Sequence, residues 1–222
     1  MNTIIISLER APERRERIQL QIDSLSLSHI IMDAVDGAKL SEEDLNKKIC
    51  LPGGYRFGEL FKPGEIGCTM SHIKALEIAI DKKWDYVIVL EDDVIIAEDI
   101  EKRIKLLFKI LPADWDHVYL SGIPKIPPQA SSILFPNIQP SVFTECTHSM
   151  MINGGAFDKI IERLSRFETT TDDIYCDMIK KNYIHSYTYY PFVTYAKDDY
   201  TYIWDQKITR EHKSKQYFKN KI

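Results

Sequence analysis

One apolar run in the chain is followed directly by three acids. Residues Tyr86–Leu90 (YVIVL) carry no charge, are rich in β-branched side chains and are too few to cross a membrane. This pattern predicts a strand buried on both faces, as in a parallel sheet covered by helices. Glu91, Asp92 and Asp93 follow at its carboxyl end, where open α/β sheets bind their ligands. The stretch therefore predicts a ligand site at this edge of the sheet.

The three acids have two interpretations. In extended backbone, Glu91 and Asp93 point to one side and Asp92 to the other. Packing three carboxylates costs repulsion, which a divalent cation relieves, and their hard oxygens suit Mg²⁺ or Mn²⁺ bound together with substrate phosphates. The functional interpretation is a metal–diphosphate site. The alternative is a solvated acidic turn that caps the next helix.

The rest of the pattern alternates strands with helices. Strands are expected over Thr3–Leu8, His29–Val35, Asp116–Ser121, Phe143–Ile152 and Tyr183–Tyr195. Helices are expected over Pro12–Ser24, from Ser41, and over Ser71–Asp81 (with Ile73, Leu76 and Ile80 inside), Glu98–Ile110, Ala156–Leu164 and Ile174–Lys181. Two long segments read as functional loops, Ile49–Gly64 and Gly122–Pro140. The alternation predicts one α/β domain over residues 1–206 and a separate basic tail over residues 207–222.

Several polar side chains near the expected strand ends are candidates for binding. Arg10, Arg14 and Arg17 lie three to four residues apart at the first β–α turn, where arginine holds phosphate; the interleaved glutamates favour a salt-bridged surface helix instead. Asp36 ends the second strand, where it would accept from ribose hydroxyls or form a turn with Gly37.

Two further candidates lie at expected helix starts. Ser71 and His72 fall in the first turn of the expected helix, so the histidine binds a ligand or caps. The run Thr169–Asp173 predicts a helix N-terminus, and capping there does not exclude chemistry.

Composition narrows the classes of function. The chain has 222 residues and a net charge of −4, which gives no reason to expect nucleic acid binding. Four separated cysteines favour neither structural zinc nor a disulfide framework, and no signal peptide is evident, so a cytoplasmic protein is expected. The basic, aromatic tail has two interpretations, peripheral contact with an anionic membrane face and a solvated terminus.

The order of these motifs resembles the family 25 glycosyltransferases, which assemble bacterial lipooligosaccharide and lipopolysaccharide and are related to collagen galactosyltransferases. The matching pieces are Ile5–Arg10 with Arg14-Arg15, Ala34–Gly37, Gly64–Cys68 with Ser71-His72, Val89–Val94, Asp114–Asp116 and Thr147-His148. The likeness covers about residues 3–195 and weakens after Asp173. The glutamine and the serine-isoleucine pair that the family carries after Pro191 are absent, so its acceptor-side contacts are not carried over.

The resemblance implies a GT-A-like fold and transfer of galactose or glucose from a UDP-sugar to a saccharide or glycolipid acceptor. It implies Mn²⁺ or Mg²⁺ at an acidic (DXD-type) motif, with Glu91 and Asp93 as ligands. Transfer is expected to invert the anomeric carbon, with Asp172 or Asp173 as the base. The donor-binding residues it implies are Ser7, Leu8, Arg10, Arg14, Asp36, Ser71, His72, Glu91, Asp92, Thr147 and His148.

Two other classes of function compete with this one. A nucleotidyltransferase that activates sugars usually has a glycine-rich loop after its first strand, and Leu8–Arg15 contains no glycine. A non-catalytic carbohydrate-binding or scaffold protein would keep the fold without the reaction. The intact acid cluster argues against it, and the divergent C-terminal third argues for it.

Overall fold

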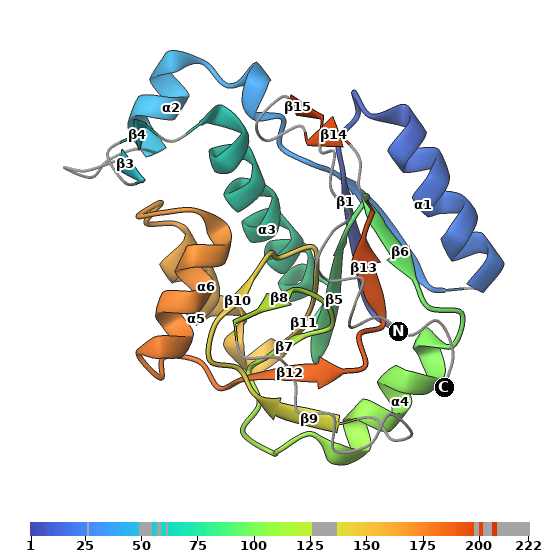
Figure 1. Ribbon diagram of the computed structural model, residues 1–222. Coiled ribbons are helices and arrows are strands. Elements are labelled where there is room, and N and C mark those ends of the chain that lie inside the picture. The colour runs from blue at the N-terminus through green and yellow to red at the C-terminus, as the bar shows by residue number, and fades with distance from the viewer. Residues whose placement is uncertain are drawn as a thin grey trace.

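The centre of the protein, seen in a computed structural model, is a seven-stranded mixed sheet in the order β2-β1-β5-β11-β7-β12-β9 (Figure 1). The structure describes residues 1–25, 27–48, 55–56, 59–60, 62–125, 137–197, 200–201 and 206–207. The seven strands are β1 (Thr3–Ser7), β2 (His29–Asp33), β5 (Tyr86–Glu91), β7 (His117–Tyr119), β9 (Asn137–Pro140), β11 (Ser149–Asn153) and β12 (Ser186–Tyr190). Strands β2, β1 and β5 are parallel, whereas β11 runs antiparallel to both β5 and β7. The predicted α/β class with a mixed sheet flanked by helices is confirmed.

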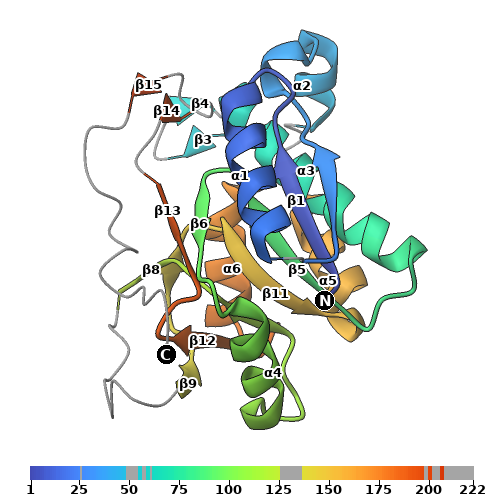
Figure 2. The same ribbon diagram turned by 90° about the vertical axis from the view of Figure 1, so that its right-hand side faces the viewer.

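Helices cover both faces of this sheet. They are α1 (Pro12–Leu25), α2 (Glu42–Lys48), α3 (Pro63–Asp81), α4 (Ile100–Ile110), α5 (Phe157–Leu164) and α6 (Thr171–Lys180), with short 3₁₀ helices η1 (Gly37–Lys39) and η2 (Gly154–Ala156). Helices α1 and α4 lie on one face, in front of the sheet in Figure 2, and α3, α5 and α6 lie on the other. None of the helices in the described ranges is long and apolar enough to cross a bilayer.

Strand β5 joins the two hydrophobic cores. Its side chains alternate: Val87 and Val89 pack into the cluster under α3 and α5, whereas Ile88 and Leu90 pack into the cluster under α1 and α4. All four side chains are fully buried. The prediction of a strand buried on both faces is confirmed, and each fully buried aliphatic side chain contributes about 1.5–3 kcal/mol.

Four pairs of short strands lie outside the main sheet. They are β6 (Val94–Ile96) with β13 (Thr194–Ala196), β8 (Ile123–Pro124) with β10 (Thr144–Glu145), β3 (Tyr55–Arg56) with β4 (Glu59–Leu60), and β14 (Tyr200–Thr201) with β15 (Gln206–Lys207). The β6–β13 pair matters for the site, because it fixes the chain directly after the acids: the N–H of Lys197 donates to the carbonyl of Asp93 (2.8 Å).

The helix expected from Ser71 begins eight residues earlier. Pro63 occupies the first turn of α3, where its missing N–H is no loss, and the Glu65 side chain accepts from the N–H of Lys62 (2.9 Å). Ser71 and His72 therefore lie in the middle of α3, so the capping role considered for His72 is wrong. Ile80 is also 39% exposed rather than inside, since the inner face turns toward Ala75 and Ala79.

Two expected strands are broken. The strand predicted over Phe143–Ile152 is divided into β10 and β11, because Cys146 takes a left-handed conformation (φ 74°). Thr147 and His148 lie in this break. The strand predicted over Tyr183–Tyr195 is divided into β12 and β13 around Pro191.

The two long loops are only partly described. Residues 137–140, expected within the second loop, form β9 and pair with β12. Most of the Ile49–Gly64 segment, residues 126–136 and residues 208–222 of the basic tail lie outside the described residues. The other expected elements form close to their predicted ends, including α1 and α4, α5 after the Asn153–Gly155 turn, and α6.

Candidate functional site

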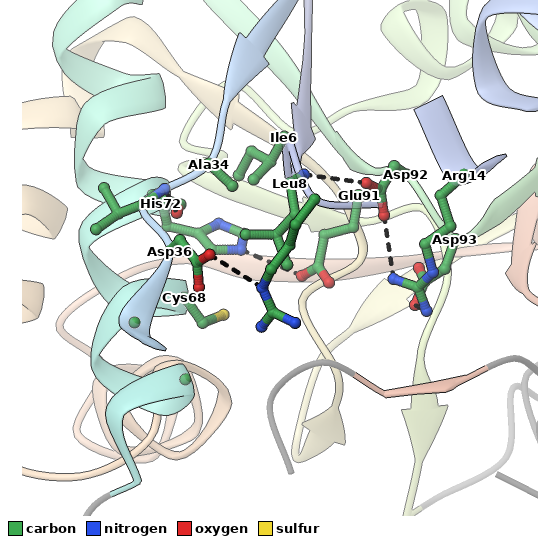
Figure 3. A pocket seen from close by; sticks show the side chains of 15 residues that line it. Ile6, Leu8, Arg14, Ala34, Asp36, Cys68, His72, Glu91, Asp92 and Asp93 are labelled. Atoms are coloured by element: carbon green, nitrogen blue, oxygen red, sulfur yellow. Dashed lines mark hydrogen bonds and ion pairs between the residues drawn. The ribbon is translucent and has the colours of Figure 1, made fainter. Parts of the chain in front are cut away.

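A pocket opens at the carboxyl ends of β1, β2 and β5, the edge of the sheet that the acids predicted (Figure 3). Its lining is contributed by the loop after β1, the first turn of α1, the end of β2, η1, one face of α3 and the acids after β5. Nine of the predicted site residues line it: Leu8, Arg10, Arg14, Asp36, Ser71, His72, Glu91, Asp92 and Asp93. The topology thus gathers residues from six segments into one pocket.

The three acids do not alternate as extended backbone would place them. Strand β5 ends at Glu91, and Asp92 and Asp93 form a turn before β6. Both turn residues lie against Arg14, with Nη1 at 3.1 Å from Asp92 Oδ1 and Nη2 at 3.4 Å from Asp93 Oδ2. Glu91 instead accepts from Thr147 Oγ1 (3.2 Å) and contacts His72 Nε2 (3.3 Å). The expectation that Glu91 and Asp93 share one side and Asp92 the other is wrong, because the turn pairs Asp92 with Asp93.

Asp92 is held entirely by the protein. Its Oδ1 accepts from Arg14, and its Oδ2 accepts from the N–H of Leu8 (3.2 Å). Burial raises the pKa of Asp92, and the Arg14 guanidinium opposes that rise. Because both of its oxygens have partners, Asp92 fits the role of fixing Arg14 and the β1–α1 loop better than that of a metal ligand.

Asp93 fits a hard cation. Its Oδ1 is buried and has no hydrogen-bond partner among the described residues. Burial raises the pKa of Asp93 to about 7; Arg14 opposes this rise, and the charges of Glu91 and Asp92 add to it. A buried carboxylate oxygen without a donor, beside two other acids, is a position where Mg²⁺ or Mn²⁺ would relieve repulsion.

Glu91 occupies a different environment from Asp93. Burial raises its pKa, but the hydrogen bond and charge of His72, with His148 and Thr147, lower it by more. Glu91 is therefore the acid of the three that most readily keeps its negative charge. Glu91 lies between α3 and the turn that carries Asp93 (Figure 3).

Arg10 and Asp36 form a second polar pair at the mouth of the pocket. The Arg10 Nε donates to Asp36 Oδ2 (2.9 Å), and Asp36 Oδ1 accepts from the N–H of Ala38 as the cap of η1 (3.1 Å). The turn interpretation of Asp36 is confirmed. Asp36 also belongs to the lining of the pocket.

Helix α3 approaches this edge very closely. A Cβ on Gly67 would lie 2.6 Å from the carbonyl oxygen of Val35 and 2.7 Å from the nitrogen of Gly37, so only glycine fits. One turn later, Ser71 Oγ accepts from the N–H of Val35 (2.8 Å) and donates to the carbonyl of Gly67 (2.7 Å). This contact brings the side chains of Cys68 and His72 into the pocket.

Other predicted residues support the pocket without lining it. Ser7 is buried and contacts Arg15, while Thr147 and His148 lie behind Glu91, whose N–H donates to the His148 carbonyl (2.9 Å). Asp172 and Asp173 accept from Thr170 Oγ1 (2.7 and 3.0 Å), and Asp172 Oδ1 accepts from the N–H of Asp173 (3.1 Å). The N-cap residue Thr170 makes no side-chain hydrogen bond to the described backbone of α6. Asp172 is still near enough to raise the pKa values of Cys68 and Cys146, although burial is the larger cause.

Cys68 is the pocket residue that sequence analysis did not single out. It precedes His72 by four residues, the spacing that places two side chains on one helical face. Because the helix was expected to begin at Ser71, that spacing was not recognised. Its side chain points into the pocket next to His72 (Figure 3).

Comparison with known proteins is consistent with these observations. The model of glycosyltransferase family 25 (LPS biosynthesis protein) matches residues 1–136. Procollagen galactosyltransferase 2 of Homo sapiens is 32% identical over 123 residues, which are 52% of this chain and 20% of that protein. Inactive glycosyltransferase 25 family member 3 of Homo sapiens is 33% identical over 123 residues, 52% of this chain and 21% of that protein.

Solved structures are more distant. A197 from STIV aligns with a TM-score of 0.44 and 13% sequence identity, and the alignment covers 96% of both chains. Apo mouse xyloside xylosyltransferase 1 aligns with a TM-score of 0.42 and 12% identity, covering 83% of this chain and 70% of that one. Likeness at this level carries no argument about function.

Proposed function

Because the chain belongs to glycosyltransferase family 25, we propose that it transfers a hexosyl group, galactose or glucose, from a UDP-sugar to a saccharide acceptor. The observation that carries the proposal is the buried, unpartnered Oδ1 of Asp93 among three acids in a pocket at the sheet edge. A nucleoside diphosphate bound there with Mn²⁺ or Mg²⁺ would satisfy that oxygen and offset the charge of the acids. Relatives matched over a fifth of their length include a procollagen galactosyltransferase, which supports the hexose class.

Each polar group of the pocket has a role in this proposal. Asp93, with Glu91, would hold the cation, which supplies charge neutralisation on the leaving diphosphate. Arg14 lies beside both turn acids and is positioned to share its guanidinium with a phosphate oxygen. Asp36 would accept from the ribose or base, with Arg10 fixing its orientation. Thr147 and His148 support Glu91 from behind and are positioning residues.

The proposed transfer also needs a general base. An inverting transfer needs a carboxylate beside the acceptor hydroxyl. Asp172 and Asp173 are the proposed candidates, supported by their place in the first turn of α6. Asp172 is also near enough to Cys68 and Cys146 to raise their pKa values. Their bonds to Thr170 hold the carboxylates in fixed orientations.

A second candidate function is a non-catalytic sugar-nucleotide or carbohydrate-binding protein. It is favoured by the internal pairing of Asp92 and Asp93 with Arg14, which offsets charge without a ligand, and by the relative named as inactive. Release of free sugar from UDP-galactose or UDP-glucose in the absence of acceptor distinguishes the two candidate functions. A transferase slowly transfers the sugar to water, whereas a binding protein does not.

Thermal unfolding with UDP tests the site. A ligand that binds only the folded state raises the melting temperature, by the equivalent of about 2.7 kcal/mol at 100 times Kd. We expect UDP with Mn²⁺ to raise the melting temperature of the wild type, and EDTA to abolish this shift. The control variant Asp81→Asn, which changes an exposed acid outside the pocket, should show the same shift as the wild type. Asp93→Asn should show no Mn²⁺-dependent shift. An undiminished shift in Asp93→Asn would remove Asp93 from the metal site.

A further inference from the structure

Three different metal-binding side chains converge on one side of the pocket. Cys68 and His72 come from consecutive turns of α3, and Glu91 ends β5. Their Sγ, one ring nitrogen and one carboxylate oxygen all lie within 4.8 Å of one another. Figure 3 shows the three side chains pointing toward the same space. We propose that Cys68, His72 and Glu91 form a site for a borderline-soft divalent cation of the Zn²⁺ class, separate in chemistry from the hard-cation position at Asp93.

The donor set selects the metal. A thiolate, an imidazole and a carboxylate suit Zn²⁺, whereas Mg²⁺ and Mn²⁺ prefer oxygen ligands alone. Three protein ligands would leave the fourth tetrahedral position for water or a ligand. This site goes beyond the proposed transfer reaction, and Zn²⁺ binding itself does not depend on that reaction. The two sites share Glu91 as a ligand, so Zn²⁺ and a hard cation at Asp93 would compete for its carboxylate.

The distance between the His72 and Glu91 ligand atoms matches a tetrahedral ion. With Zn–N and Zn–O bonds of roughly 2.1 Å, a nitrogen and an oxygen on the same ion lie about 3.4 Å apart. His72 Nε2 and Glu91 Oε1 are 3.3 Å apart, which is long for a charge-assisted hydrogen bond. A sulfur ligand should lie about 3.6 Å from that nitrogen. Cys68 Sγ lies within 4.8 Å of the other two ligand atoms, so it needs to approach by about 1.2 Å at most.

The surroundings hold these ligands in place. His72 is 1% exposed and its backbone belongs to the middle of α3, so the ring is fixed by packing. Thr147 donates to Glu91 Oε1 and Thr171 donates to Cys68 Sγ (3.6 Å), and both bonds orient ligand atoms as outer-shell partners do. Cation binding converts the Cys68 thiol to a thiolate, and its proton leaves to solvent.

Cobalt substitution tests the site directly. The metal-free full chain is titrated with Co²⁺ in a thiol-free reducing buffer, and the near-ultraviolet thiolate-to-cobalt absorption is followed, then displaced by Zn²⁺. We expect this absorption band in the wild type and its loss in Cys68→Ser. The Zn²⁺ affinity of Cys68→Ser should be weaker by roughly 100-fold or more, because removal of an outer-shell partner alone weakens metal affinity by about 10–100-fold. His72→Gln should weaken Zn²⁺ to a similar extent.

The controls separate this site from other thiols and from the proposed reaction. Cys146→Ser and Cys50→Ser should keep the band, and so should Asp93→Asn, whatever that variant does to UDP binding. Melting temperatures in EDTA show whether each variant is folded. A band that persists in Cys68→Ser, that is lost with Cys146 or Cys50 instead, or that never forms in the folded wild type would overturn the assignment.

Discussion

Removal of the Arg14 guanidinium should destabilise the protein strongly and in a pH-dependent manner. Arg14 lies between Asp92 and Asp93, and its side chain is 10% exposed, against 6% for Asp92 and 22% for Asp93. Arg14→Met keeps much of the apolar stem but leaves both acids without their cation. Loss of one partner of a buried ion pair costs about 3–5 kcal/mol, and the partial exposure of Asp93 places the expected loss near the lower limit, at ~3 kcal/mol.

The sign of the pH dependence follows from the acids. In the folded protein the pKa of Asp93 is raised to about 7 and that of Asp92 is also raised, both mainly by burial. A carboxyl whose pKa is higher when folded binds more protons in the folded state, so stability rises as pH falls from about 7 toward 4. Without Arg14 these pKa values rise further. The loss in Arg14→Met should therefore be largest at pH 8 and smaller at pH 5.5.

Urea unfolding in EDTA at both pH values measures this. Arg166→Met is the control: Arg166 is 49% exposed and pairs with the 59% exposed Glu162, and such surface pairs contribute about 0–1 kcal/mol. The double variant Arg14→Met/Asp93→Asn should recover part of the loss at pH 8. An equal loss for Arg14→Met at pH 8 and pH 5.5, with no recovery in the double variant, would refute the electrostatic explanation and leave only packing.

Three further predictions concern other parts of the chain. Gly67→Ala should lower the free energy of unfolding by about 2 kcal/mol in urea titrations, because the added Cβ would meet backbone atoms on which α3 packs. The control Gly155→Ala should be nearly neutral, and equal effects of the two substitutions would contradict the close approach of α3. Asp172→Asn or Asp173→Asn should lower transfer turnover by roughly 100-fold or more without loss of UDP binding, and full activity in both would exclude them as the base. If the tail meets anionic lipid, deletion of residues 207–222 should abolish sedimentation with anionic liposomes; equal binding to neutral liposomes would contradict the electrostatic basis.

The sequence predicted the part of the fold that depends on local pattern. An uninterrupted β-branched run identified β5, and its position before three acids located the pocket correctly. The start of α3 was missed because Pro63 and Gly64 ended a glycine- and proline-rich segment that favours a loop, although Pro63 is well placed in a first helical turn. That error moved His72 to a helix end and concealed its spacing from Cys68.

The errors within the site come from long-range contacts. The turn at Asp92 and Asp93 is fixed by Arg14 and by the β6–β13 pair, whose strands are about a hundred residues apart in the chain. No local periodicity reports such pairing. The same holds for Asn137–Pro140, whose apparent loop composition is overridden by pairing with β12.

The position of β5 between both cores has a consequence for how the site moves. The amides of Val89 and Leu90 cannot exchange with solvent through opening of one face alone, since alternate side chains anchor the strand in both clusters. Their hydrogen exchange should therefore require global unfolding, as in the most protected class of amides. The end of β5 therefore holds Glu91 in a fixed position. The charged groups of the pocket then need to move little when a charged ligand binds.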